Sequence, residues 1–394
     1  MKNISILLGI VIFLVAVASC TGNAPTSTPA MDTDAVATIV AATLTAFPTA
    51  IPTSTEAAPE PISFCRFGAI SSLGTTNFTP VDGKGAIAYS SDSLQDGLTL
   101  IFPDTGEIVP LHQLRTQGLV GTDTGVSWSP DGTKIAFLYS ESWTPKSESY
   151  LMLADLLLGE ICPIVDVQAK YGRPVWSPDG QMLALVDYGN GQLKVIKLDD
   201  GSELTVGENV FEASFDEARP MWLDSEHVVY IRMTETEFVA DLVNQSLDGT
   251  TPNVILERIS GLRDFSFSRD GKWLAYSVRG NIILRNLQTG SEQNLGDDLS
   301  SPYWSLDSNY LLGKAGLSAI WLIQPNSSNQ ITVLDFYGCL GNEPWASDSQ
   351  RFAVLLCTDG SKPSKIAVYD LNTMELQEMT VEDQSPSFPA WNND

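Results

Sequence analysis

A five-residue turn, Trp-Ser-Pro-Asp-Gly, occurs at residues 128–132 of this 394-residue chain and returns at residues 176–180. Weaker forms follow, in which an aromatic residue precedes a short turn containing an acidic or amide residue. The aromatic residues stand at positions 128, 176, 222, 267, 304, 345 and 391, with a mean spacing of about 44 residues. Four-stranded propeller blades repeat at about 40–45 residues. The repeat therefore predicts a closed ring of small β-sheets.

The chemistry of the turn explains its composition. Proline presets φ for the second position, Asp hydrogen-bonds the nearby backbone, and Gly accepts positive φ. A tryptophan is large enough to fill the wedge between two neighbouring blades. We therefore expect the repeated acidic residues to form corners and not to act as catalytic groups or metal ligands. They are Asp131, Asp179, Asp224, Asp270, Asp307 and Asp348.

The segments after each turn also repeat. Alternating apolar residues bounded by Gly, Asp and Asn, as in 192–201, 281–290 and 365–373, are typical of strands in hairpins. No long helical period occurs between residues 84 and 394. The whole unit resembles the WD40-like repeat of TolB-type β-propellers, over about residues 84–394 and most closely at Trp128 and Trp176. The resemblance implies an all-β, seven-bladed β-propeller; six blades are the alternative, because the interval 267–304 is short.

The two ends of the repeat region complement each other. Residues 85–89 and 98–106 look like the later strands of a repeat that lacks its first strand. Residues 388–391 look like a first strand with nothing after it. We therefore expect the N- and C-terminal strands to share one blade, which would close the ring and remove its sheet edges.

The N-terminus predicts export. Residues 1–19 combine Lys2 with an apolar run that is short for a membrane span, and the sequence Val17-Ala-Ser-Cys20 resembles a bacterial lipobox. We expect a signal peptide at 1–19, lipidation of Cys20, a Thr/Ala/Pro-rich linker at 20–61 and the propeller at 62–394. This predicts a membrane-anchored lipoprotein outside the cytoplasm, in the periplasm or at the cell surface. The alternative is a plain secretory signal or a single membrane anchor.

Four cysteines remain after Cys20, and three pairings are possible. Disulfides are common in exported proteins. A hairpin centred near residues 348–349 would bring Cys339 close to Cys357, so we predict a disulfide between them. Buried free thiols are the alternative, and the sequence leaves the state of Cys65 and Cys162 open.

The net charge and the sequence motifs limit the classes of function that the chain is expected to have. A net charge of −26 argues against nucleic-acid binding, which needs a basic surface. The chain has two histidines, His112 and His227, both expected in loops or at the surface, and none of the short catalytic or metal-binding motifs. Some TolB-like propellers are fused to a serine-hydrolase domain, but this chain ends at the expected ring closure. We therefore predict no enzyme activity, no cofactor and no metal site; a carboxylate-based hydrolase such as a glycosidase is the alternative.

Arginines suggest a binding site. Three residues before the aromatic residue, at the mouth of the inner strand, stand Arg173 and Arg219, and Arg263 precedes Asp264 at the equivalent place in the next repeat. Arginine forks bind carboxylate or phosphate bidentately. We predict a binding module for an envelope protein, a glycan or a small anionic ligand, with local ion pairs to Asp216, Glu217 or Asp264 as the alternative. A structural scaffold without a ligand is the second candidate function.

Overall fold

The computed structural model describes residue 65 and residues 75–90, 97–114, 122–141, 148–168, 172–211, 219–315, 319–325, 330–335, 338–357, 363–379, 386 and 389–393. The expected signal peptide at 1–19, the lipidation site Cys20 and the linker at 20–61 lie outside these residues. Within the described part, strands and turns form the fold and no α-helix occurs, so no helix there is able to cross a membrane.

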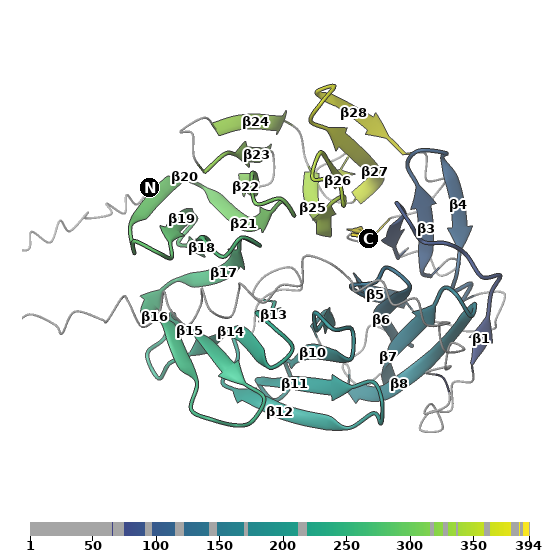
Figure 1. The fold of residues 1–394 in the computed structure, drawn as a ribbon, viewed down its shortest axis with the longest axis horizontal. Helices are drawn as coiled ribbons and strands as arrows, with labels where there is room; N and C mark the ends of the chain where they lie inside the picture. Colours follow the sequence, from purple (N-terminus) through teal and green to yellow (C-terminus); the bar gives the residue numbers. More distant parts are fainter. Residues whose placement is uncertain are drawn as a thin grey trace, which may run out of the picture.

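The sheets are arranged around the centre of a ring, and within each sheet the strands follow one another from the centre outward (Figure 1). Five sheets are named here by their innermost strand: the β5, β9, β13, β17 and β21 sheets. The β5 sheet contains β1 (Thr76–Asn77), β5 (Thr122–Trp128), β6 (Lys134–Ser140), β7 (Glu148–Asp155) and β8 (Glu160–Gln168). The β9 sheet contains β9 (Val175–Trp176), β10 (Met182–Asp187), β11 (Gln192–Lys197) and β12 (Glu203–Glu208). The β13 sheet contains β13 (Met221–Trp222), β14 (His227–Met233), β15 (Val239–Ser246) and β16 (Asn253–Ser260).

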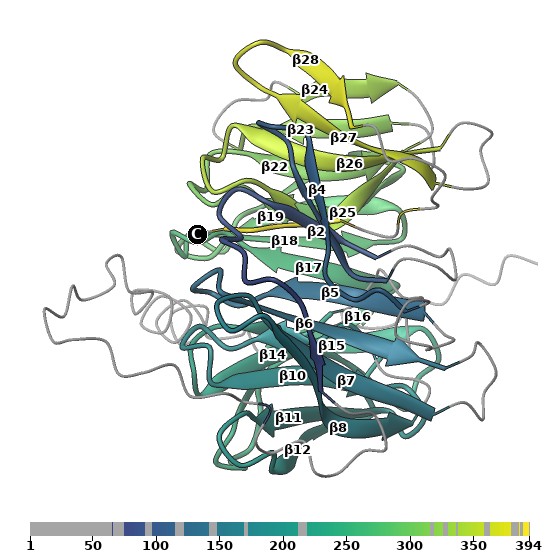
Figure 2. The ribbon, with the colours of Figure 1, turned by 90° about the vertical axis from the view of Figure 1, so that its right-hand side faces the viewer.

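The ring continues through two more four-stranded sheets. The β17 sheet contains β17 (Leu262–Phe267), β18 (Trp273–Val278), β19 (Asn281–Asn286) and β20 (Glu292–Asp297). The β21 sheet contains β21 (Leu299–Trp304), β22 (Leu311–Ala315), β23 (Ala319–Ile323) and β24 (Gln330–Asp335). Seen from the side, the sheets stand next to one another around the ring (Figure 2).

The sixth sheet has eight strands, in the order β28-β27-β26-β25-β29-β2-β3-β4. Its strands are β2 (Ile87–Tyr89), β3 (Thr99–Phe102), β4 (Glu107–Pro110), β25 (Gly338–Trp345), β26 (Arg351–Cys357), β27 (Pro363–Asp370), β28 (Glu375–Glu378) and β29 (Ala390–Trp391). Two runs of four strands meet where β25 pairs with β29 in parallel, at Glu343 and Ala390. The hydrogen bonds therefore define an all-β propeller of six sheets, in place of the seven separate sheets that the repeat count predicted.

The close approach of β25 and β29 explains why the two runs merge. A Cβ atom at Gly341 would clash with the carbonyl oxygen of Pro389, and the amide of Asn342 donates a 2.8 Å hydrogen bond to that oxygen. The glycine allows the two backbones to come within hydrogen-bonding distance.

The expected sharing of a sheet by the two chain ends is confirmed. β29 pairs antiparallel with β2, with Ile87 opposite Trp391. The amide of Asn392 donates to the carbonyl oxygen of Ala86 at 2.9 Å, and its side-chain Nδ2 donates to Gly83 at 2.8 Å. Because Trp391 is 1% exposed, the last residues of the chain belong to the core.

The repeated acidic residues form corners, as predicted. Ser129 Oγ donates to Asp131 Oδ1 at 2.6 Å, and the same oxygen accepts the amide of Thr133 at 3.1 Å. Gly132 has φ 64°. Burial raises the pKa of Asp131, but the hydrogen bonds from Ser129 and Thr133 outweigh burial and lower it below its ordinary value. The serine–aspartate bond recurs at Asp179, Asp270 and Asp307.

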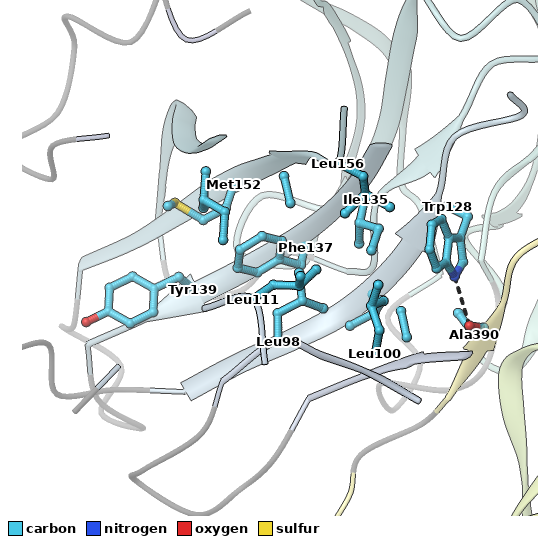
Figure 3. Packing of buried hydrophobic residues seen from close by; sticks show 14 of the residues in the cluster. Leu98, Leu100, Leu111, Trp128, Ile135, Phe137, Tyr139, Met152, Leu156 and Ala390 are labelled. Carbon is cyan, nitrogen blue, oxygen red and sulfur yellow. Dashed lines mark hydrogen bonds between the residues drawn. The ribbon is translucent and has the colours of Figure 1, made fainter. Parts of the chain in front are cut away.

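The tryptophans join neighbouring inner strands. At five of the seven aromatic positions, the indole Nε1 donates to the carbonyl oxygen of the residue before the aromatic position of the preceding repeat. The pairs are Trp128–Ala390 (2.9 Å), Trp176–Ser127 (3.1 Å), Trp222–Val175 (3.0 Å), Trp304–Ser266 (3.1 Å) and Trp345–Tyr303 (3.1 Å). Figure 3 shows the first pair at the edge of the apolar cluster between β2–β4 and the β5 sheet. Phe267 has no donor for such a bond.

The predicted Cys339–Cys357 disulfide is wrong, because Cys339 is a free thiol. The β25–β26 hairpin pairs Trp345 with Phe352, but a bulge between Leu340 and Trp345 shifts the register. Cys339 then lies opposite Leu355 instead of Cys357. The disulfide joins Cys65 to Cys162 on β8, with Cα atoms 5.5 Å apart.

Candidate functional site at the ring centre

The three predicted arginines come from consecutive sheets. Arg173 and Arg219 precede β9 and β13, and Arg263 is the second residue of β17. Figure 1 shows β13 and β17 near the centre of the ring, and β9 contacts β13. The three predicted residues therefore stand at or beside the inner strands of three consecutive sheets.

Arg219 makes the contacts that define the site. Its Nη1 donates a 2.6 Å hydrogen bond to the carbonyl oxygen of Asn342 on β25. Its guanidinium carbon lies 4.2 Å from the ring centroid of Tyr303 on β21. Arg219, which precedes β13, thus contacts residues of β25 and β21, two strands that belong to other sheets of the ring. Both partners are neutral, and Arg219 forms no ion pair within the described residues.

Arg173 and Arg263 differ in their surroundings. Arg173 is half-buried and packs against β5, where a Cβ atom on Gly125 would lie 3.3 Å from its Cα. Gly125 has φ +65°, so that position suits glycine both in conformation and in space. Arg263 is exposed. The meeting of all three guanidinium groups stays a prediction.

The alternative of local ion pairing is tested only in part. Asp216 and Glu217 lie outside the described residues. Asp264 is buried, and its Oδ1 accepts the amide of Phe265 at 2.7 Å.

A carboxylate on β25 completes the polar centre. Glu343 accepts a 3.1 Å hydrogen bond from Ser127 Oγ and a 3.5 Å hydrogen bond from the amide of Trp128. Desolvation lowers the pKa of Arg269, and the attraction of Glu343 acts in the opposite direction. Arg269 stands in the turn after Phe267, where the first two repeats have proline. The ring centre therefore carries charges of both signs.

Sequence reasoning missed Tyr303, Glu343 and Arg269. Asn342 stands three residues before Trp345, at the position that Arg173 and Arg219 occupy in their repeats. The group that binds Arg219 is its backbone oxygen, which no sequence pattern reveals. The replacement of proline by Arg269 in the turn was the one available signal, since a charged residue there departs from the repeat.

The histidines also required correction. His112 was expected in a loop or at the surface; it lies after β4 but is fully buried, with Nδ1 2.8 Å from Asp123 Oδ2. The amide of Leu98 donates to the same carboxylate oxygen at 2.8 Å. His227 is half-buried and contacts Asp224 at 2.9 Å. Among the described residues, no group of three or more His, Cys, Asp or Glu side chains is placed to hold a metal ion.

Comparison with known proteins supports the fold. No family model matches the chain. The uncharacterized peptidase YuxL of Bacillus subtilis is 25% identical over 205 residues, which cover 50% of this chain and 30% of that protein. The match thus spans less than a third of the length of this curated relative.

Solved propellers align over most of the chain. TolB from Acinetobacter baumannii is 16% identical, with 80% of this chain and 68% of that chain covered and a TM-score of 0.49. An oligogalacturonate lyase is 14% identical, with 76% and 87% covered and a TM-score of 0.50. At such identities the likeness to the lyase shows the propeller fold alone.

The prediction that the chain is not an enzyme is contradicted, because the curated relative carries the name of a peptidase. The absence of short catalytic motifs does not exclude an enzyme on this fold. In a propeller, loops from several blades meet at one mouth, so catalytic groups can come from distant parts of the sequence.

Proposed function

We propose that this chain is a TolB-like propeller that binds an anionic ligand at the ring centre. Arg219 supports the proposal most directly. Its guanidinium is half-buried, and its described partners are a carbonyl oxygen and the face of an aromatic ring. Neither contact neutralises the charge, and a guanidinium in such surroundings favours a carboxylate or phosphate. Arg173 and Arg263 would add donors from the two adjacent sheets.

The ligand class that we favour is a carboxylate-bearing segment of another protein. A peptide presents carboxylates together with backbone N–H donors, so its carboxylates would suit the arginines while its N–H groups would suit the Glu343 carboxylate at the same centre. The peptidase name of the curated relative is consistent with a peptide ligand. An anionic glycan is the second ligand class, and a scaffold without a ligand is the second candidate function.

We further propose seven repeats and a lipid anchor. Counting the eight-stranded sheet as two blades, one with β25–β28 and one with β29 and β2–β4, gives one blade for each aromatic position. Cys20 would carry the lipid after removal of residues 1–19, and residues 20–61 would tether the ring. The Cys65–Cys162 disulfide supports a location outside the cytoplasm, where such bonds form and persist.

Calorimetric titration of the purified protein with hexaglutamate and with hexaglutamine tests the binding proposal. We expect hexaglutamate to bind, with an affinity that falls as salt rises, and hexaglutamine not to bind. The double variant Arg173→Ala/Arg219→Ala should lose this binding while its melting temperature changes little. Arg285→Ala is the matched control, because Arg285 pairs with Glu292 in the β17 sheet, away from the ring centre.

The outcomes separate the alternatives. A double variant that loses stability and still binds hexaglutamate would show that the arginines are structural. Binding of an oligogalacturonate in place of hexaglutamate would favour the glycan, and binding of neither would favour the scaffold.

A further inference from the structure

Two nucleophilic side chains from different sheets, Lys314 and Cys339, lie next to each other. Lys314 is on β22 of the β21 sheet, and Cys339 is the second residue of β25. Lys314 Nζ lies 3.6 Å from Cys339 Sγ. Both residues are half-buried.

The side chains of Lys314 and Cys339 are available to react with each other. Cys339 is a free thiol, and Lys314 forms no ion pair with a carboxylate within the described residues. The β-ladders hold the two backbones in place, since Lys314 lies opposite Ile320 and Cys339 lies opposite Leu355. The lysine side chain alone is long and flexible enough to move toward the sulfur.

We propose that Lys314 and Cys339 form an oxidative crosslink between two neighbouring sheets, with a peroxide as the oxidant. The Cys339 sulfur attacks the peroxide, the O–O bond breaks, and the sulfur gains a hydroxyl group as a sulfenic acid, while the other peroxide oxygen leaves as water or an alcohol. The neutral Lys314 amine then attacks that sulfur. An N–S bond forms, the S–O bond breaks, and the hydroxyl leaves as water with a proton from nitrogen.

One molecule of peroxide is enough to balance the crosslinking reaction. The protein loses two hydrogen atoms and two electrons, and the peroxide is reduced to two molecules of water or to water and an alcohol. A thiol reductant reverses the step by attack on the sulfur of the N–S bond. Extracytoplasmic proteins meet oxidants, and the Cys65–Cys162 disulfide shows that this chain is oxidised elsewhere.

The crosslink would stiffen the proposed binding site. Cys339 precedes Asn342 on β25, and Lys314 belongs to the sheet of Tyr303. Asn342 and Tyr303 are the two residues that Arg219 contacts. A covalent bond between the two sheets would fix the spacing of its partners.

The competing reaction is a disulfide with Cys357. On β26, Cys357 lies two residues beyond Leu355, the partner of Cys339, so it is a diagonal neighbour. Diagonal neighbours have Cα atoms about 7–8 Å apart, beyond the usual reach of a disulfide. Lys314 is therefore better placed than Cys357 to react with an oxidised Cys339.

Peptide mapping of the whole protein decides between these products. The protein is treated with hydrogen peroxide, alkylated, and digested with a protease that cuts at acidic residues. We expect a crosslinked pair of peptides, one with Lys314 and one with Cys339, lighter than their sum by two hydrogen atoms and released by dithiothreitol. Lys314→Arg and Cys339→Ser should lose the pair, while Cys357→Ser, the matched control, should keep it.

Two results would overturn the proposal. One is a Cys339–Cys357 disulfide as the product in the native chain. The other is oxidation of Cys339 to sulfinic or sulfonic acid to the same extent in the native chain and in Lys314→Arg, because an amine that traps the sulfenic acid must protect it.

Discussion

The indole Nε1 of Trp128 donates a 2.9 Å hydrogen bond to the carbonyl oxygen of Ala390, which lies 262 residues further along the chain. Ala390 belongs to β29, the strand that joins the two ends of the chain, and Figure 3 shows the indole beside it. In five of the seven repeats, the aromatic residue of the repeat also supplies the donor that attaches its sheet to the preceding inner strand. The bond between Trp128 and Ala390 extends this pattern to the strand at the end of the chain.

Trp128→Phe should therefore destabilise the ring more than its loss of apolar area implies. The substitution removes the donor and leaves the Ala390 carbonyl oxygen without it in a buried site. We expect a loss of about 1–3 kcal/mol in the free energy of unfolding, measured by denaturant titration. Trp273→Phe is the control, because Trp273 is half-buried and its indole has no hydrogen bond within the described residues. Equal losses in the two variants would contradict this role of the indole N–H.

Deletion of residues 385–394 should lower the stability of the fold more than Trp128→Phe does. It removes the strand between β25 and β2, with the buried Trp391, and leaves two sheet edges unpaired. Truncation of one buried tryptophan alone costs about 3–5 kcal/mol, so the melting temperature should fall by many degrees or the protein should fail to fold. A shortened protein with the same melting temperature as the full chain would refute the closure of the ring by β29. Asn372→Ala, an exposed change in the β27–β28 turn, should leave the melting temperature unchanged.

The sequence predicted the ring because its determinants are local. The turn chemistry of Asp131 and Gly132 and the spacing of the aromatic residues depend on a few adjacent positions, and the structure confirms both. The cysteine pairing failed for a physical reason. A bulge between Leu340 and Trp345 moved the register, and a bulge leaves no clear sign in the alternation of residues.

The ring centre was predictable only in outline. Arg173 and Arg219 could be placed near the inner strands because they occupy the same position in two successive repeats, and Arg263 stands one residue before that position in the next. The partners of Arg219 could not, since one is a backbone oxygen and the other, Tyr303, comes from a strand across the ring. The burial of His112 was missed because its carboxylate partner, Asp123, lies on a strand of the neighbouring sheet.

The Cys65–Cys162 disulfide should carry a large share of the stability. It closes a loop of 97 residues, for which the chain-entropy model gives about 4–5 kcal/mol. Cys65→Ser should lower the free energy of unfolding by about 2–5 kcal/mol, while Cys339→Ser should change it little. If reduction leaves the wild-type denaturation curve in place, the bond contributes nothing to folding.

The lipobox makes a prediction about the precursor. Cys20→Ser should either release the protein from membranes or leave the signal peptide uncleaved, because lipidation needs the thiol. Membrane fractionation and N-terminal mass analysis measure the two effects. A variant that is processed normally and sediments with membranes as the wild type does would rule out lipidation at Cys20.

Acid should weaken the ring through its corners. Hydrogen bonds lower the folded-state pKa of Asp131, Asp179 and Asp270 below 3.8, the ordinary value that the unfolded chain keeps. A carboxyl group with a lowered pKa stabilises the folded state above the unfolded value, and this contribution disappears as pH falls through the folded value. The melting temperature should therefore fall progressively below a pH of about 4.

Asn substitutions identify the source of this acid sensitivity. Asp131→Asn keeps an oxygen acceptor for the amide of Thr133 but no longer titrates. Its melting temperature should be lower than that of the wild type at neutral pH, and the difference should shrink as pH falls below the ordinary value and through the lowered pKa of the wild-type carboxyl group, which then loses its charge. Asp199→Asn is a surface control, since Asp199 is exposed in the β11–β12 turn. A difference between Asp131→Asn and wild type that stays constant with pH would show that the corner acts through its shape and not through its charge.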